Sequence, residues 1–248
     1  KWLFRTYFKH AMRPYLTQGF TCGKEAARWL LGNELGKKAI LQRNAIDTLL
    51  YRFDEVVRLE VRQELHLPED ATVVGHVGRF NRQKNHEFLL EVFHKYVQEL
   101  NSTAHLLLVG TGKLQKVIQK KIQQFRLTDQ VHLLGERPDV NRLLQAMDLF
   151  LFPSFMEGLS VSMVEAQCAG LPCVVSDRIP HEAALTDLVS FLSLETAPRQ
   201  WAHEIERVRC MANRRTGYYQ QIADAGYDIA QNAKWLQNYY LRQWDKTR

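Results

Sequence analysis

Two glutamates, Glu157 and Glu165, have a spacing that suits contact with the two ends of an elongated ligand. They stand in the stretch PSFMEGLSVSMVEA, which covers residues 153–166. Eight helical positions span roughly 12 Å, whereas the two carboxyl groups of a retaining sugar hydrolase lie only about 5 Å apart. The pair therefore suits two carboxylates that bind hydroxyl groups on opposite sides of a diphosphate. A surface glutamate followed by an unrelated helix glutamate is the alternative that spacing alone favours.

The turn after Glu157 has a composition that allows the backbone to approach a ligand closely. It follows an expected strand and opens an expected helix, which is where α/β folds bind their ligands. Glycine can turn where other residues cannot, and the amides at the start of a helix favour anions. The amides that would face a phosphate there belong to Gly158, Leu159 and Ser160.

A second stretch, GRFNRQKN at residues 78–85, places two cations on another loop between a strand and a helix. Arg79 offers a planar fork of donors and Lys84 a compact point charge, and both suit a diphosphate. Fixed cations also stabilise the negative charge on a departing diphosphate, so that role needs no metal ion. Gly78 opens the loop and belongs to the expected site. Taken alone, a loop of this kind is more often simply solvated.

Four other motifs lack a residue that their chemistry needs. GTGK is followed by Leu114 where a P-loop has a magnesium-binding Ser or Thr, and Gln115 stands at the third glycine of a dinucleotide fingerprint. GLSVS has Ser162 where a nucleophile elbow has its second glycine. HEAAL, which begins at His181, lacks the second histidine of a zinc-protease helix. We expect neither a metal site nor a cofactor.

Short apolar runs alternate with amphipathic stretches from residue 72 to residue 177, which predicts strands separated by helices. The expected strands cover residues 72–77, 105–109, 131–134, 148–152 and 173–176. They lack polar alternation, as is typical of parallel strands covered on both faces. We therefore predict an α/β fold with a doubly wound, Rossmann-like parallel sheet, and both ligand-facing stretches at its carboxyl edge.

The segments on either side of this pattern predict further pieces. Residues 1–43 predict an aromatic helix (Trp2, Phe4, Tyr7, Phe8) ending at Pro14, then a strand (19–22), a helix (24–31) and a strand (39–42) with no sheet of their own to join. After residue 198, helices are expected over 201–211 and 216–231, followed by an aromatic helix from Trp235 to Trp244. We divide the chain into an N-terminal remnant (1–43), a main domain (44–230) and a final helix (231–248).

The composition of the chain favours some classes of binding partner and excludes others. The formal charge of +6 and the pI of about 9.1 favour anionic ligands such as nucleotide phosphates, although a solvated basic face is the simpler explanation. The aromatic residues do not alternate with Lys and Arg as a base-stacking surface requires, so nucleic acid is not an expected partner. No apolar run approaches the roughly 20 residues of a membrane span. Four cysteines without framework spacing predict free thiols in the cytoplasm. The first residue, Lys1, suggests a piece of a longer protein.

Taken together, the stretches resemble glycosyltransferase family 4, a group of retaining enzymes with the two-domain GT-B fold. NAID at residues 44–47 is similar to the family's Asn-Gly-hydrophobic-Asp hinge, with Ala45 in place of glycine. GRFNRQKN, LLLVGTGK, HLLGERPDV and DLFLFPSFMEG follow in the family's order. Glu157 and Glu165 have the spacing of its Glu-x7-Glu motif, and EAQCAGLPCVVSD continues it. The residues within these motifs most resemble those of bacterial capsular and exopolysaccharide hexosyltransferases.

The resemblance implies a role for each site residue. Arg79 and Lys84 would hold the diphosphate of a nucleotide-sugar donor, with UDP the favoured nucleotide. Glu157 would contact hydroxyl groups of the donor sugar, and we expect it to share the catalytic contacts with the two cations. Glu165 would bind the ribose. The amides near Leu159 and Ser160 would contact the β-phosphate, and the base would lie near Gly135 and Arg137.

The resemblance also implies what lies outside the chain. The family's acceptor site belongs to the early N-terminal domain, and the last helix braces that domain. We therefore expect a chain that binds the donor but transfers the sugar poorly to its glycan or lipid-linked acceptor. Peripheral membrane contact through the N-terminal domain is left open. The alternatives are a non-catalytic nucleotide-sugar-binding subunit that activates a partner chain, a nucleotide-sugar epimerase and, least favoured, a Rossmann dehydrogenase.

Overall fold

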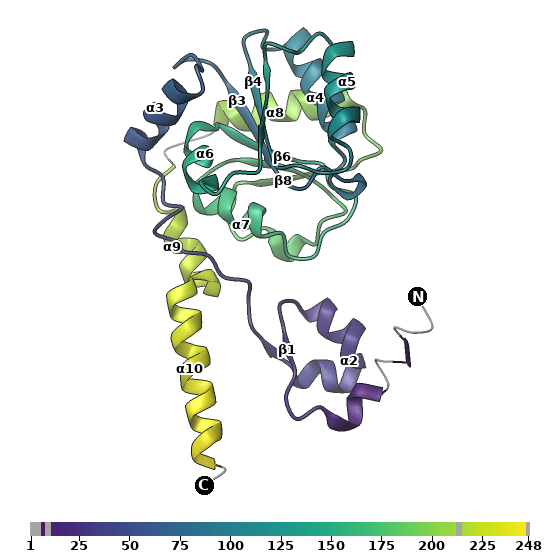
Figure 1. Ribbon diagram of the computed structural model, residues 1–248, viewed down its shortest axis with the longest axis vertical. Helices are drawn as coiled ribbons and strands as arrows, with labels where there is room; N and C mark the ends of the chain where they lie inside the picture. Colours follow the sequence, from purple (N-terminus) through teal and green to yellow (C-terminus); the bar gives the residue numbers. More distant parts are fainter. Residues whose placement is uncertain (1–5, 8–10, 212–214, 247–248) are drawn as a thin grey trace. The chain divides into compact units, whose positions relative to one another are not determined.

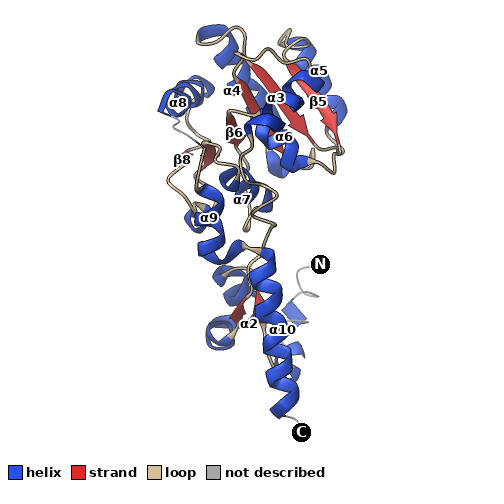
Figure 2. Ribbon diagram, turned by 90° about the vertical axis from the view of Figure 1, so that its left-hand side faces the viewer, coloured by secondary structure: helices blue, strands red, loops and turns tan. Residues whose placement is uncertain are grey.

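The computed structural model describes residues 6–7, 11–211 and 215–246 and divides into two compact units. The larger unit comprises Ile46–Ala225, and the smaller one joins Lys1–Ala45 to Gly226–Arg248. Figure 1 shows the larger unit as a sheet with helices on both sides, and Figure 2 shows the same layers from the side.

The larger unit is built on six parallel strands in the order β5-β4-β3-β6-β7-β8. Chain order runs outward from the centre in both directions, so the order of the strands, though not their direction, reverses between β3 and β6. The strands are β3 (Val73–Val77), β4 (His105–Val109), β5 (Val131–Gly135), β6 (Leu149–Phe152), β7 (Cys173–Ser176) and β8 (Val189–Leu192). Loops on either side of such a reversal form the usual ligand crevice of this architecture.

Two helical layers cover the two faces of this sheet. One core packs α4 (His86–Glu99), α5 (Gln115–Gln124) and α8 (Pro198–Met211) on the sheet, and the other packs α3 (Glu55–Glu64), α6 (Val140–Ala146) and α7 (Val161–Cys168). Neighbouring strand residues point to opposite faces, so Leu106 joins the first core and Leu107 the second. This explains why the strands contain no polar alternation.

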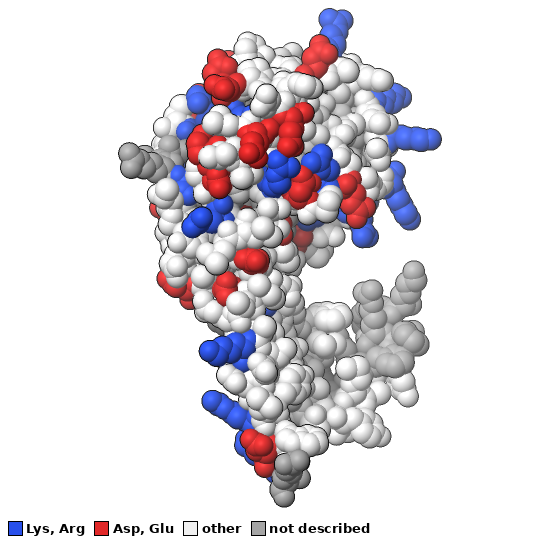
Figure 3. Space-filling model, turned by 60° about the vertical axis from the view of Figure 1, so that its left-hand side comes forward, with Lys and Arg blue, Asp and Glu red and all other residues white. Residues whose placement is uncertain are grey.

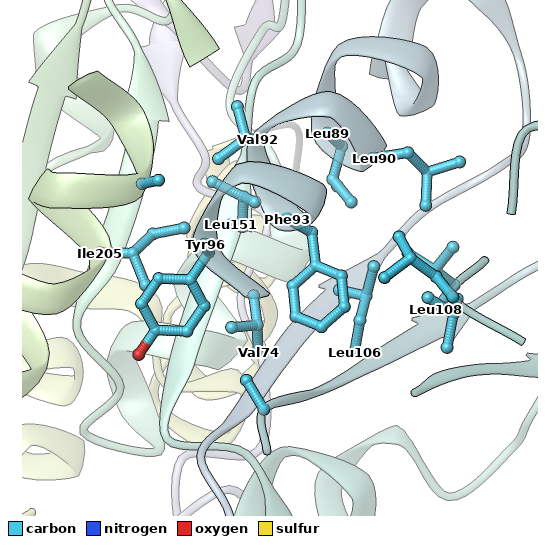
Figure 4. Close-up of a cluster of buried hydrophobic side chains, with 14 of the residues drawn as sticks. Val74, Leu89, Leu90, Val92, Phe93, Tyr96, Leu106, Leu108, Leu151 and Ile205 are labelled. Atoms are coloured by element: carbon cyan, nitrogen blue, oxygen red, sulfur yellow. The ribbon is translucent and has the colours of Figure 1, made fainter. Parts of the chain in front are cut away.

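In the first core, helix α4 packs on the central strands of the sheet. Figure 4 shows side chains of α4 lying on strand residues of β3, β4 and β6. Phe93 and Tyr96 are completely buried there, together with Val74 and Leu106. Burial of each side chain of this size contributes about 1.5–3 kcal/mol relative to exposure, so the sheet and α4 form a rigid base for the loops above them.

The doubly wound α/β prediction is confirmed, and the five expected strands begin and end within one residue of their predicted positions. Apart from short 3-10 turns, helix α3 and strand β8 at the sheet edge were not predicted. Two helices were predicted incompletely, because the expected helix at 201–211 begins at Pro198 and the one at 24–31 continues to Lys38 past a bend at Gly32, where φ is 82°.

The helix expected over residues 216–231 is wrong as a single element. The chain forms α9 (Tyr218–Ile222), then a π-helical turn (Ala223–Tyr227), and only then α10 (Ile229–Lys246). Gly226 interrupts the helix with φ of 85°, a left-handed conformation that glycine adopts without a steric penalty.

The smaller unit contains a sheet of its own, contrary to the prediction. β1 (Phe20–Thr21) pairs in parallel with β2 (Ile40–Leu41) on either side of α2 (Lys24–Lys38). Helix α10 packs here, since the Phe20 ring meets Tyr239 edge to face with 5.3 Å between ring centroids. The Asn232 side chain also donates to the carbonyl of Arg43 at 3.5 Å. Trp2, Phe4 and Phe8 lie outside the described residues.

Candidate functional site

The two stretches that the sequence singled out end neighbouring strands at the reversal of the sheet. Residues 78–85 follow β3, and residues 153–160 follow β6. The strands are hydrogen-bonded neighbours, with Val74 opposite Leu149 and Gly75 opposite Phe150. Parallel strands bring both loops to the same edge, so loops separated by some 70 residues of sequence meet at one place.

The first loop has a fixed conformation because its own polar side chains hold it. The Asn81 side chain accepts a hydrogen bond from the Lys84 amide at 3.1 Å and so caps the single 3-10 turn Arg82–Lys84. Asn85 then takes a left-handed conformation with φ of 55°, which ends that turn and starts α4. Asparagine tolerates this conformation better than most residues. The position of Lys84 is therefore set by the backbone around it.

Gln83 joins the two loops directly. Its carbonyl accepts a hydrogen bond from the Phe155 amide at 2.9 Å, and its side-chain amide donates to the carbonyl of Met156 at 2.8 Å. These bonds hold the segment just before Glu157 against the segment just before Lys84. The sequence offered no signal for this role of Gln83, because its partners lie more than 70 positions away.

Lys84 and Glu157 form an ion pair across the joined loops. Lys84 Nζ lies 3.0 Å from Glu157 Oε1, and their side chains are only 13% and 8% exposed. The ammonium group also lies 4.4 Å from the centroid of the Phe152 ring, a cation–π contact. The structure thus brings together two residues predicted to contact the donor, and it does so in a setting with little water to screen them.

Close backbone packing explains the glycines beside the pair. A Cβ on Gly110, whose φ is +131°, would lie 2.2 Å from the carbonyl oxygen of Gly78, and one on Gly112 would lie 2.3 Å from that of Phe80. Hydrogen bonds run between the same loops, including Phe80 N to Thr111 O at 2.8 Å. The GTGK turn therefore packs against the loop at residues 78–85, which we call the cation loop. This structural role fits a turn that lacks key residues of both phosphate-binding motifs.

Arg79 differs from Lys84 in having no internal partner. Its side chain is exposed, and it makes no hydrogen bond or ion pair with any residue in the described ranges. An unpaired guanidinium beside a buried ion pair is free to turn toward an arriving anion. Lys84, by contrast, must share its charge with Glu157 when an anion binds.

The turn after Glu157 leads into α7 without strain. Ser160 is the N-cap residue and its carbonyl accepts bonds from Met163 and Val164. A Cβ on Gly158 would meet nothing within 4 Å, and its φ lies outside the left-handed region. Neither the conformation nor crowding by this chain requires glycine here, and the space it leaves faces outward.

Glu165 lies on α7 and is held by a residue that the sequence did not suggest. The hydroxyl group of Tyr51 donates to Glu165 Oε1 at 2.7 Å. Burial raises the pKa of Glu165, and the Tyr51 hydrogen bond opposes that shift. Burial and the same contact raise the pKa of Tyr51 well above its usual value, so the phenol keeps its proton.

The residues expected near a nucleotide base, Gly135 and Arg137, lie at the end of β5 and just after it. Gly135 has φ of +70°, and its carbonyl accepts a hydrogen bond from the Gly110 amide at 2.7 Å. Arg137 forms a bidentate pair with Asp139, with N–O distances of 2.7 Å and 2.6 Å. That hydrogen bonding raises the pKa of Arg137 and lowers the pKa of Asp139. The Arg137 guanidinium is thus already occupied.

Two buried histidines next to the cation loop, His76 and His86, were not singled out by the sequence analysis. His76 is fully buried on β3, and its ring lies 4.7 Å from that of His86 at the start of α4. His76 Nδ1 bonds the carbonyl of Leu151 at 2.8 Å. Burial lowers the pKa of His76 well below its usual value and that of His86 to about 4, with nearby Lys84 acting in the same direction. Both are therefore neutral at pH 7.

Charges elsewhere on the surface are mixed. On the face in Figure 3, acidic side chains gather near the middle of the larger unit, and Lys and Arg side chains project along its right-hand edge. Within the described residues, no group of three or more His, Cys, Asp or Glu side chains is placed to hold a metal ion. In the same part of the chain, no helix is long and apolar enough to cross a lipid bilayer.

Comparison with known proteins identifies the fold and the family. The chain is 34% identical over 237 residues to the putative glycosyltransferase EpsF of Bacillus subtilis, covering 94% of this chain and 62% of that protein. It is 36% identical over 116 residues, 46% of its length and 30% of the relative's, to an Escherichia coli UDP-Gal:alpha-D-GlcNAc-diphosphoundecaprenol alpha-1,3-galactosyltransferase.

Among solved structures, Anabaena Alr3699/HepE in complex with UDP and glucose superposes with a TM-score of 0.79 at 19% identity. The superposition covers 95% of this chain and 66% of that one, which places the larger unit among GT-B folds. Residues 57–222 match the family described as Glycosyl transferases group 1, and the chain belongs to that family.

Proposed function

We propose that this chain binds the donor of a retaining hexosyltransferase, which takes a hexose from a nucleotide-diphosphate sugar and passes it to a glycan or lipid-linked acceptor in polysaccharide biosynthesis. UDP is the proposed nucleotide. The chain spans 62% of the length of the B. subtilis relative. Two relatives support the choice of nucleotide, since one solved structure contains UDP and glucose and the E. coli protein is named for UDP-Gal.

The observation that carries this proposal is the Lys84–Glu157 ion pair at the reversal of the sheet. It joins a cation suited to phosphate and a carboxylate suited to sugar hydroxyls within 3.0 Å. A diphosphate attached to a sugar presents both of these groups next to each other. In the proposed arrangement Lys84 and Arg79 bind the diphosphate, and Glu157 accepts hydrogen bonds from the hexose.

The remaining contacts extend this arrangement along the ligand. The amides near Leu159 and Ser160 begin α7 and face the β-phosphate, where the positive end of the helix favours an anion. Glu165, one turn further along α7, accepts hydrogen bonds from the ribose. The base lies beside Gly135, with Arg137 held next to it by Asp139.

The proposed chemistry is departure of the diphosphate from the anomeric carbon. As that bond breaks, negative charge collects on the β-phosphate, and preorganised cations there stabilise the transition state more than the ground state. Retention would follow from attack by the acceptor on the face that the diphosphate leaves. A leaving-group oxygen would then take the acceptor's proton.

Isothermal titration of the chain with UDP, GDP and their hexose conjugates tests the proposal. We expect UDP to bind, and Lys84→Ala to weaken binding by about 10- to 150-fold, the equivalent of about 1.5–3 kcal/mol for a hydrogen bond to a charged group. Lys120→Ala is the matched control, because that lysine is exposed on α5. Failure of every nucleotide to bind, or equal effects of the two substitutions, would refute the proposal.

A further inference from the structure

We propose that Tyr51 is a positioning residue that fixes the Glu165 carboxylate for two neighbouring hydroxyl groups of the donor's ribose. This inference rests on the proposed function, which assigns the ribose to Glu165. Tyr51 would not touch the ligand itself. It would act by holding one carboxylate oxygen so that the other is presented in a set direction.

The geometry of the contact leaves part of the carboxylate available. An ionised carboxylate offers about four acceptor positions. Tyr51 uses one of them, on Oε1, through a hydrogen bond of 2.7 Å. Among the described residues, Oε2 has no hydrogen-bond partner. A vicinal diol presents two donors a short distance apart, which fits a carboxylate whose plane is already fixed.

Tyr51 is itself held in place. It ends the turn that begins at Asp47, whose side chain accepts bonds from the amides of Leu49 and Leu50 at 3.2 Å and 3.1 Å. The same turn bonds α7 at a second point, where the Cys168 thiol lies 3.5 Å from the carbonyl of Thr48. Tyr51 also packs against the second apolar core. Its hydroxyl group is therefore presented to α7 by a rigid turn.

The donor and acceptor roles in this contact are settled by chemistry. The phenol is protonated across the whole working range, since burial and Glu165 both oppose its ionisation and so raise its pKa. Its single proton is donated to Glu165. A free glutamate side chain would have to lose rotamer freedom when it grips a ligand, whereas one already held by Tyr51 loses less.

The test compares four proteins: wild type, Tyr51→Phe, Glu165→Ala and the double variant. Each is titrated with UDP and with 2′,3′-dideoxyuridine diphosphate, which lacks both ribose hydroxyls, or with the corresponding guanine pair if the chain prefers GDP. We expect Tyr51→Phe to weaken UDP binding by about three- to tenfold, as loss of one preorganised side chain does. Binding of the dideoxy analogue should be unchanged, and Tyr51→Phe should have no effect in the Glu165→Ala background.

The chain supplies a matched control in Tyr96→Phe. The Tyr96 hydroxyl also donates to a carboxylate, Glu206 Oε2, at 2.7 Å, but it lies in the first core and away from the loops. We expect this variant to bind UDP as the wild type does. Thermal unfolding of all variants separates loss of fold from loss of orientation.

The outcomes distinguish failure of this inference from failure of the proposed donor-binding function. If wild type binds neither UDP nor GDP, or if Glu165→Ala binds UDP as tightly as wild type, the proposed function fails and the inference falls with it. If Glu165→Ala loses UDP but Tyr51→Phe does not, only the inference is overturned. Equal losses for UDP and its dideoxy analogue, or additive effects in the double variant, would likewise overturn it.

Discussion

Replacing Glu157 by Gln should make the chain bind UDP more tightly, although Glu157 belongs to the proposed donor site. Lys84 Nζ lies 3.0 Å from Glu157 Oε1. A diphosphate that reaches Lys84 must share the ammonium group with this carboxylate and lie close to its negative charge. Glutamine keeps the shape and an acceptor oxygen for Lys84 but removes the repulsion.

The size of the gain follows from the same distance. A phosphate oxygen on the far side of Nζ would lie about 6 Å from Glu157 Oε1, and at an effective dielectric constant of about 20 unit charges at that separation repel by about 3 kcal/mol. Salt and the remaining exposure of the pair reduce this value. We expect a net gain of about 1–2 kcal/mol, which is about a 5- to 30-fold lower Kd for UDP.

UDP-hexose should respond differently, because Glu157 also accepts hydrogen bonds from the sugar in the proposed arrangement. The advantage of UDP-hexose over UDP should therefore shrink in Glu157→Gln. Isothermal titration with both ligands measures this, at low and high salt. Glu182→Gln changes the net charge equally at an exposed position and is the control. Weaker or unchanged UDP binding by a folded Glu157→Gln protein would refute the electrostatic reasoning.

Two further predictions concern the packing that supports the loop at residues 78–85. Gly110→Ala would place a Cβ 2.2 Å from the Gly78 carbonyl at φ of +131°, and we expect a loss of about 2–4 kcal/mol in the free energy of unfolding by urea titration; a variant as stable as wild type would contradict this packing. Because the folded pKa of His86 is about 4 and an unfolded histidine has one near 6.5, the unfolded chain takes up the proton first as pH falls. Stability present above pH 6.5 should thus decline below it, by about 2 kcal/mol from this residue at pH 5, and the decline should be smaller in His86→Leu.

The sheet could be predicted from the sequence because its information is local. Each central strand is an apolar run buried on both faces, so pattern alone located it. β8 (Val189–Leu192) was overlooked, and its short run is interrupted by the polar Ser190. β5, at the opposite edge of the sheet, is also mostly only partly buried, so edge position alone does not account for the omission. Helix α3 was overlooked although its apolar residues follow helical spacing as clearly as those of the predicted α8. Its position also depends on Arg62, whose buried guanidinium binds Asp148 at 2.7 Å.

The residues expected to hold the diphosphate and the sugar were predicted as two separate stretches, and the contacts between these stretches could not be predicted. Nothing local indicates that Gln83 bonds Met156 or that Lys84 meets Glu157, since these contacts depend on β3 and β6 being neighbours. The pairing of β3 with β6 follows from the order of a doubly wound sheet, so the fold prediction implied that the loops would meet. It did not imply which side chains would touch.

The two glutamates of the site illustrate how much those contacts change the expected chemistry. The sequence treats Glu157 and Glu165 alike, as two carboxylates eight positions apart. In the structure one is held by a cation and the other by a neutral hydroxyl group. In the proposed arrangement both Glu157 and the diphosphate bind the Lys84 ammonium group, so Glu157 competes with the ligand for it. Tyr51 does not contact the ligand in this arrangement, so its hydrogen bond to Glu165 does not compete with ligand binding. Neutralising the first should therefore tighten UDP binding, and removing the second carboxylate should weaken it, a difference in sign that spacing alone could never supply.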